Sequence, residues 1–101
     1  MENKEIFIQA INEKKKVKVK INTDEKGIII RDCIPFDFGT GKLPGIRYHF
    51  LDLTSPDGPH NLSVLPNKLL EIEILDETFN PADYIKWKPN WKLARDWGEF
   101  S

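Results

Sequence analysis

Hydrophobic and charged side chains alternate in two separate stretches of the chain, and this alternation predicts two β-strands. Residues 68–75 read KLLEIEIL, which places Leu70, Ile72 and Ile74 on one face and glutamates on the other. Residues 16–21 read KVKVKI, which places valines and an isoleucine on one face and lysines on the other. Paired side by side, these strands would set lysines beside glutamates, and each such pair contributes roughly 0.2–1 kcal/mol. We therefore predict that the first strand of a small sheet pairs with the last.

A helix is predicted over residues 3–15, before the first strand. Asn3 is the expected N-cap, because its side-chain oxygen can accept a hydrogen bond from a free backbone N–H. A helix this short is stable only when it packs on other structure, so we expect it to cover one end of the sheet. The apolar side chains whose spacing gathers them on one helix face are Ile6, Phe7, Ala10 and Ile11.

Turn residues divide the middle of the chain into further strands. The polar residues 23–27 end in glycine and predict a hairpin turn, whereas the glycine-rich residues 37–45 predict a loop. Pro35 has no backbone N–H to donate to a neighbouring strand, so we expect the second strand to end or to bulge there. The expected fold is mainly β (α+β), a small, strongly bent five-stranded antiparallel barrel with an N-terminal helix. Its predicted strands cover residues 17–22, 28–36, 46–54, 61–65 and 68–75.

The last quarter of the chain is rich in large aromatic side chains and holds all three tryptophans, Trp87, Trp91 and Trp97. Asn80 before a proline predicts a short helical turn over residues 81–86. So many rings are not expected to stay in water. We expect this tail either to wrap over the sheet or to dock on a second copy or a partner, and we favour wrapping. The chain then divides into residues 1–79, the sheet with its helix, and residues 80–101, the tail.

Composition restricts the classes of protein that fit. The chain has 101 residues, with 15 basic and 16 acidic side chains and a net charge of −1, so any basic surface must be local. Cys33 is the single cysteine, which excludes an internal disulfide and favours a reducing compartment. No apolar run approaches the ~20 residues that span a bilayer. We expect a cytoplasmic protein that does not bind membranes.

The order of the segments resembles the WYL domain of bacterial regulators. A helix runs into a basic strand (AINEKKKVKVKI), and the second strand ends in Ile34–Pro35–Phe36. The third strand carries His49–Phe50–Leu51, or Tyr48–His49–Phe50, near the position of the family's Trp-Tyr-Leu. The closing segment reads KLLEIEILDETFNP. The resemblance covers roughly residues 6–81.

This resemblance implies a Sm-like, SH3-type β-barrel that senses ligands, often nucleotides or nucleic acid, and that usually sits behind a helix-turn-helix domain. The chain has no room for a helix-turn-helix, so we expect a stand-alone short member of bacterial or phage type. Residues 62–68 also lack the arginine that is thought to hold the ligand in the family, and Lys68 is the nearest basic residue. The implied function is a non-enzymatic ligand-binding or regulatory module.

Three surfaces are candidates for binding. A basic and aromatic ligand face could stack bases and neutralise phosphates of a small anionic or nucleotide ligand, and it would comprise Arg31, Arg47, Tyr48, His49 and Lys68. The alternative is that Arg47 pairs with an acid and Tyr48 packs in the core. A basic strand could instead follow a nucleic-acid backbone through Lys14, Lys15, Lys16, Lys18 and Lys20. The alternative is that these lysines form a solvated face beside Glu71 and Glu73. The tail could form a homodimer through Trp87, Trp91 and Trp97.

Catalytic and metal chemistry find little support in the sequence. One cysteine and two scattered histidines, His49 and His60, do not supply the clustered ligands of a zinc site. A thiol nucleophile would require Cys33 beside His49 with a lowered thiol pKa. Residues 39–42, GTGK, lack both the earlier glycine and the following serine or threonine of a phosphate-binding loop. We expect no metal, no cofactor and no enzymatic activity.

Overall fold

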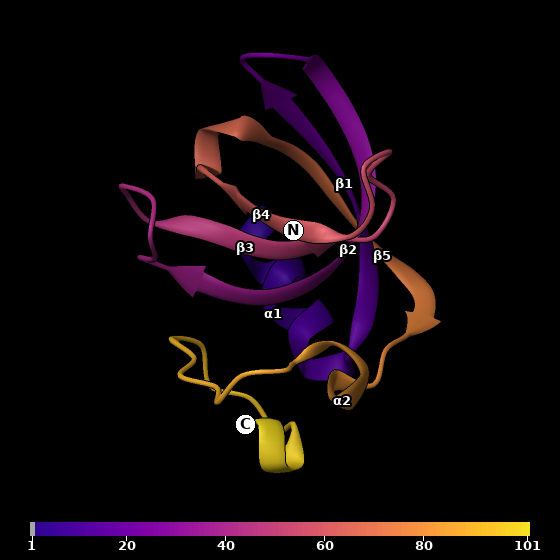
Figure 1. Ribbon diagram of the computed structural model, residues 1–101, viewed down its shortest axis with the longest axis vertical. Coiled ribbons are helices and arrows are strands. Elements are labelled where there is room, and N and C mark those ends of the chain that lie inside the picture. Colours follow the sequence, from indigo (N-terminus) through magenta and orange to yellow (C-terminus); the bar gives the residue numbers. More distant parts are fainter. Residues whose placement is uncertain (1) are drawn as a thin grey trace.

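One antiparallel sheet of five strands bends around a helix in the computed structural model, which describes residues 2–101 (Figure 1). The sheet order is β4-β3-β2-β1-β5. The prediction that the first strand pairs with the last is therefore confirmed. The helices and strands are α1 (Asn3–Glu13), β1 (Lys15–Thr23), β2 (Gly27–Gly39), β3 (Arg47–Asp52), β4 (His60–Val64), β5 (Leu69–Thr78) and α2 (Pro81–Tyr84), with 3₁₀ turns at Pro66–Lys68 and Gly98–Phe100.

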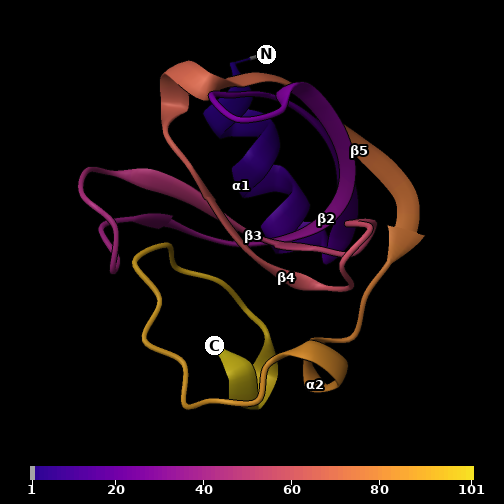
Figure 2. The same cartoon turned by 45° about the horizontal axis from the view of Figure 1, so that its top comes forward.

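The predicted closure into a barrel is wrong. Strands β4 and β5 are the two edges of the sheet, and no ladder joins them within residues 2–101. Helix α1 lies inside the bend of the sheet (Figure 2), where a closed barrel of this size would hold only side chains. The mainly β class, the five antiparallel strands and the N-terminal helix are confirmed.

Strands β1 and β5 pair as the charge pattern predicts, with one register shift between Lys15 and Val17 and a second after Lys20. Lys18 lies opposite Glu73 and Lys20 opposite Glu71. The register then shifts, because Ile21 lies opposite Leu69 and leaves Leu70 without a partner. This β-bulge turns Leu69 into the core, where it is 4% exposed, and leaves Leu70 42% exposed. The inward orientation predicted for Leu70 is therefore wrong.

Strand β2 continues through Pro35 to Gly39, so the predicted loop begins three residues later than expected. Its register against β3 shifts between Pro35 and Asp37, which confirms a bulge at the proline. The hairpin turn at its other end is also confirmed. Thr23 Oγ1 accepts a hydrogen bond from Lys26 N and donates one to Gly27 O.

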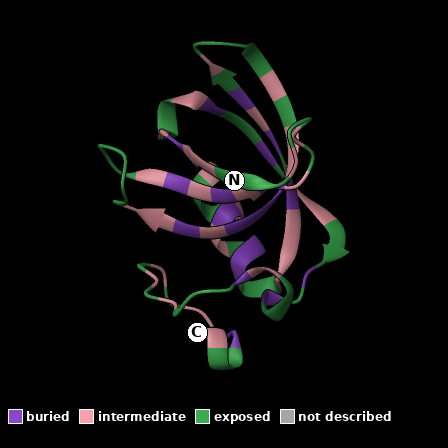
Figure 3. Ribbon diagram, in the orientation of Figure 1, coloured by how far each residue is buried: buried purple, intermediate pink, exposed green. Residues whose placement is uncertain are grey.

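Helix α1 packs on the inner face of the sheet, and buried residues recur along the helix and at alternate positions of β1 and β3 (Figure 3). The Phe7 ring meets the rings of Tyr48 and Phe50 edge-on, at centroid distances of 5.0 and 5.3 Å. Helix α1 ends at Glu13, two residues earlier than predicted, because the backbone turns left-handed at the next residue. The predicted Asn3 cap is wrong: Glu2 is the N-cap, and the Asn3 side chain donates to Leu69 O.

Residues 80–101 lie on the other side of β2 and β3 from α1 (Figure 2). Asn80 caps α2 as predicted, since its Oδ1 accepts from Ala82 N at 3.1 Å. Trp97 is buried, and its Nε1 donates to Ile11 O at 2.8 Å, which ties the tail to the end of α1. Among the described residues, none of the helices has the length and hydrophobicity to span a membrane.

Candidate functional site

The inner face of the sheet is only partly covered by α1, and a cavity of about 340 Å³ opens at the β1–β2 hairpin. Directly opposite residues of an antiparallel pair share a face. Arg31 lies opposite the buried Val19, and Asp52 lies between Cys33 and His60. Pairing thus brings side chains from β2, β3 and β4 to one place. This hairpin cavity is lined by Thr23, Asp24, Glu25, Lys26, Ile29, Arg31, Asp52, Ser55, His60 and Leu62.

An ion pair between Arg31 and Asp52 lies in the wall of the hairpin cavity. Arg31 Nε is 3.2 Å from Asp52 Oδ2, and the Asp52 residue is only 1% exposed. Thr54 N donates to Asp52 Oδ1, and Arg31 Nη1 donates to Ile30 O. The Nε atom is buried but is not aligned for a hydrogen bond with any described residue. Arg31 therefore compensates the buried Asp52 carboxylate through its charge.

The remaining charges around the hairpin cavity are mixed. The hairpin supplies Asp24, Glu25 and Lys26, and Asp24 bonds to Lys68 Nζ at 3.2 Å. The apolar side chains of Ile29 and Leu62 complete the wall. Such a surface can hold a small molecule that has an apolar part and one charged group.

A second, smaller hollow of about 230 Å³ adjoins the hairpin cavity and shares Thr23, Asp24 and Leu62 with it. Arg47 and Lys68 line this hollow. The Arg47 guanidinium donates to Ser63 O and to Pro44 O, at 3.1 and 2.8 Å, so two backbone carbonyls hold it rather than an acid.

The other two residues of the predicted ligand face lie elsewhere. Tyr48 is buried against α1, and this burial raises the pKa of its hydroxyl. His49 lies on the outer face, with its ring nitrogens 2.9 Å from Gly39 O and 2.8 Å from Ser63 Oγ. The five predicted residues therefore do not form one face, and Arg31 alone of the five lines the hairpin cavity.

The lysines predicted as a nucleic-acid surface are locally balanced by acids. Lys16 Nζ lies 2.9 Å from Glu77, and this hydrogen bond raises the pKa of the lysine. Lys18 lies 3.7 Å from Asp32, and Lys20 lies opposite Glu71. The other two predicted residues are Lys14, which caps α1, and Lys15, whose Nζ donates to Asp76 O. A polyanion would have to compete with these carboxylates for the β1 lysines.

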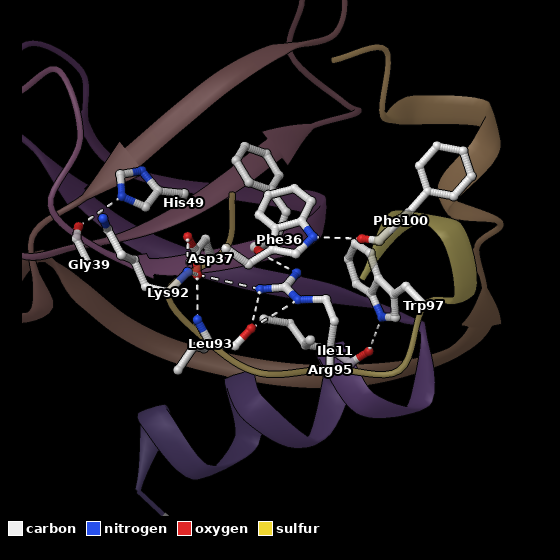
Figure 4. A network of polar contacts seen from close by, with 11 residues as sticks. Ile11, Phe36, Asp37, Gly39, His49, Lys92, Leu93, Arg95, Trp97 and Phe100 are labelled. Carbon is white, nitrogen blue, oxygen red and sulfur yellow. Dashed lines mark hydrogen bonds and ion pairs between the residues drawn. The ribbon is translucent and has the colours of Figure 1, made fainter. Parts of the chain in front are cut away.

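The tail holds a buried charge that sequence analysis missed (Figure 4). The Arg95 side chain is 0% exposed, and its guanidinium lies 4.2 Å from the Trp91 ring centroid and 4.5 Å from that of Trp97. It donates to the carbonyl oxygens of Phe36 and Leu93. We call Phe36, Asp37, Trp91, Arg95 and Trp97 the tail cluster. The sequence did contain a signal for this site, because Arg95 lies between closely spaced tryptophans and this combination favours cation–π contact.

Asp37 connects the tail cluster to the sheet. Its carboxylate accepts from the backbone N–H groups of Lys92 and Leu93, at 3.0 and 3.1 Å, and lies 3.4 Å from Arg95 Nη2. Burial lowers the pKa of Arg95 to about 10, and the Asp37 carboxylate opposes that shift. The guanidinium therefore stays charged at neutral pH, and the tail is held by a charge pair as well as by aromatic packing.

Cys33 is expected to be unreactive in the folded protein. It is fully buried, and burial first, then the charges of Asp52 and Asp32, raises the pKa of its thiol. Since the thiolate is the reactive form, a maleimide should label Cys33 only after denaturation. Mass spectrometry with and without urea measures this. Rapid labelling of the native protein would contradict the inert role and reopen the question of a thiol nucleophile.

Residues 2–101 contain no group of three or more histidine, cysteine, aspartate or glutamate side chains arranged to hold a metal ion. Comparisons of the chain with protein-family models, with curated proteins and with solved structures found no match. Function must therefore be inferred from the hairpin cavity and the surfaces of the molecule themselves.

Proposed function

We propose that this protein is a non-enzymatic binding module of the WYL type, bacterial or phage in origin, that holds a small anionic ligand in the hairpin cavity. The supporting observation is the Arg31–Asp52 pair in the wall of a cavity of about 340 Å³. That volume falls at the lower end of the range of roughly 300–1,000 Å³ that is usual for small-molecule sites.

The chemistry of the wall favours an anion with an apolar part. The Arg31 side chain is 16% exposed, and the charge of its guanidinium can attract a carboxylate or phosphate that enters the hairpin cavity. Lys26 adds a second positive charge from the hairpin, and Ile29 and Leu62 would contact the apolar part. Asp52 already neutralises Arg31, so a ligand must share the guanidinium with that carboxylate, and its affinity is expected to be modest.

The arrangement of the sheet supports the assignment to the WYL type. An N-terminal helix leads into a bent five-stranded antiparallel sheet in which β1 lies between β2 and β5. We interpret this as an open relative of the Sm-like, SH3-type barrel that the WYL resemblance implies, with the gap between β4 and β5 as the departure.

Separate substitutions of Arg31 and Asp52 are expected to change the affinity for anions in opposite directions, which makes the proposal testable. Asp52→Asn removes the carboxylate that neutralises the guanidinium and should tighten anion binding roughly fivefold, about 1 kcal/mol, whereas Arg31→Gln should weaken it by at least as much. Titration of ¹⁵N-labelled protein with inorganic phosphate and with a nucleoside monophosphate measures both through the backbone resonances of the cavity residues. In the unsubstituted protein and in Asp52→Asn, the Arg31 Nε–H resonance reports on the cavity as well.

His49→Gln is the matched control, because His49 lies on the opposite face of the sheet and should leave the affinity unchanged. Shifts confined to residues outside the hairpin cavity would contradict the proposal. So would a loss of affinity in Asp52→Asn, since that result would indicate a purely structural role for the pair.

A further inference from the structure

The tail carries three closely spaced lysines that form no ion pair among residues 2–101. Residues 86–92 read KWKPNWK, with three lysines and no carboxylate, and we call them the lysine–tryptophan segment. Lys86, Lys88 and Lys92 are all exposed, and none of them forms an ion pair with another described residue. The β1 lysines differ in this respect, because acids lie beside them. The segment is therefore the more available site for a polyanion.

An exposed tryptophan stands among these lysines on a fixed support. Trp87 is 46% exposed, and its ring meets the rings of Phe36 and Trp91 edge-on, at 5.9 and 6.1 Å. Beneath it, Ile34 and Leu51 line a hollow of only about 20 Å³, too small for a ligand. The ring is thus packed on one side and accessible on the other, so little conformational freedom is lost when a flat partner stacks on it.

We infer that the lysine–tryptophan segment binds single-stranded nucleic acid, with a base stacked on Trp87 and backbone phosphates near Lys86, Lys88 and Lys92. Aromatic rings that stack on bases, together with cations that follow the backbone, are the two elements of binding to single strands. The segment lies over the outer face of β2 and β3, whereas the hairpin cavity opens on the inner face. The two sites are therefore separate.

Charge and burial disfavour the other occupants of this surface. A second copy docking through the same segment would bring six lysines together without a carboxylate between them. A membrane anchor requires several protruding apolar side chains, but Trp97 is buried and Trp91 Nε1 is bonded to Phe100 O at 2.7 Å. Trp87 is the single strongly exposed ring of the tail among the described residues.

Fluorescence anisotropy of labelled oligo(dT) and oligo(rU) of about ten nucleotides tests the inference, a length within the usual site size. At low salt the full-length protein should bind, and log K should fall with log[salt] with a slope of about −2, since each contacted phosphate contributes roughly 0.7. Trp87→Ala should weaken binding about tenfold, and Trp87→Phe, which keeps a ring, should weaken it less.

Two triple variants with the same change in net charge locate the site. K86Q/K88Q/K92Q should abolish the salt-dependent binding, whereas K15Q/K18Q/K20Q should change affinity less than about twofold. Arg31→Gln should have no effect. Absence of binding at low salt, equal losses in both triples, or an affinity unchanged by Trp87→Ala would overturn the inference. Binding to anionic phospholipid vesicles without binding to either oligonucleotide would overturn it in favour of a membrane.

Discussion

Replacing Arg95 with alanine is expected to destabilise the protein by about 3–5 kcal/mol, because it removes one partner of a buried charge pair. The guanidinium is enclosed by Trp91 and Trp97, and it is hydrogen-bonded to the backbone of β2 through Phe36. Its loss leaves the Asp37 carboxylate in an apolar setting with only backbone N–H partners. The tail is expected to detach first, because Asp37 and Arg95 form its charged connection to the sheet.

Urea denaturation followed by tryptophan fluorescence measures this change. Arg95→Lys should recover little of the lost stability, since an ammonium keeps the charge but cannot stack between two indoles while donating in several directions. Lys42→Ala, in the exposed loop between β2 and β3, is the control and should change the free energy of unfolding by less than about 0.5 kcal/mol. A loss below about 1 kcal/mol in Arg95→Ala would show that aromatic packing alone holds the tail.

Phe7→Ala is the second large effect that we expect, at about 3–5 kcal/mol. Phe7 is fully buried and joins α1 to the inner face of β3 through the rings of Tyr48 and Phe50. The cavity left by the ring lies between helix and sheet, where the backbone of both elements limits collapse. A domain of this size has a total stability of about 5–15 kcal/mol, so either change removes a large share of it.

Guanidinium denaturation monitored by far-ultraviolet circular dichroism tests the Phe7 prediction. Ile28→Ala is the matched control, because it also deletes apolar volume but from an exposed position on β2. It should cost less than about 0.5 kcal/mol. If the two variants lose similar stability, α1 contributes little to holding the sheet in its bent form.

The proposed ligand site and the proposed nucleic-acid site use opposite faces of β2 and β3. The hairpin cavity belongs to the inner face, beyond the part that α1 covers, and the lysine–tryptophan segment belongs to the tail that covers the outer face. Variants of one site are therefore expected to leave the other unchanged, and each proposal can fail without the other.

Local patterns in the sequence were sufficient for several features. Alternation with a period of two predicted β1 and β5, and their opposite charges predicted that they are neighbours, as the pairing of Lys18 with Glu73 confirms. The polar turn that ends in Gly27 and the Asn80 cap were also predictable, because each depends on hydrogen bonds between residues close in the chain. These features need no knowledge of distant residues.

What the sequence determined by itself was thus the elements, the turns and the first-to-last pairing of strands. Only the tertiary structure decided that Leu69 rather than Leu70 is buried, that Arg31 meets Asp52, and that Arg95 lies between two tryptophans. It also decided that α1 occupies the bend and that the sheet stays open. The physical reason is that a local period specifies which face of a strand is apolar, whereas a bulge, a buried ion pair or a cation between rings depends on residues that long-range pairing brings together.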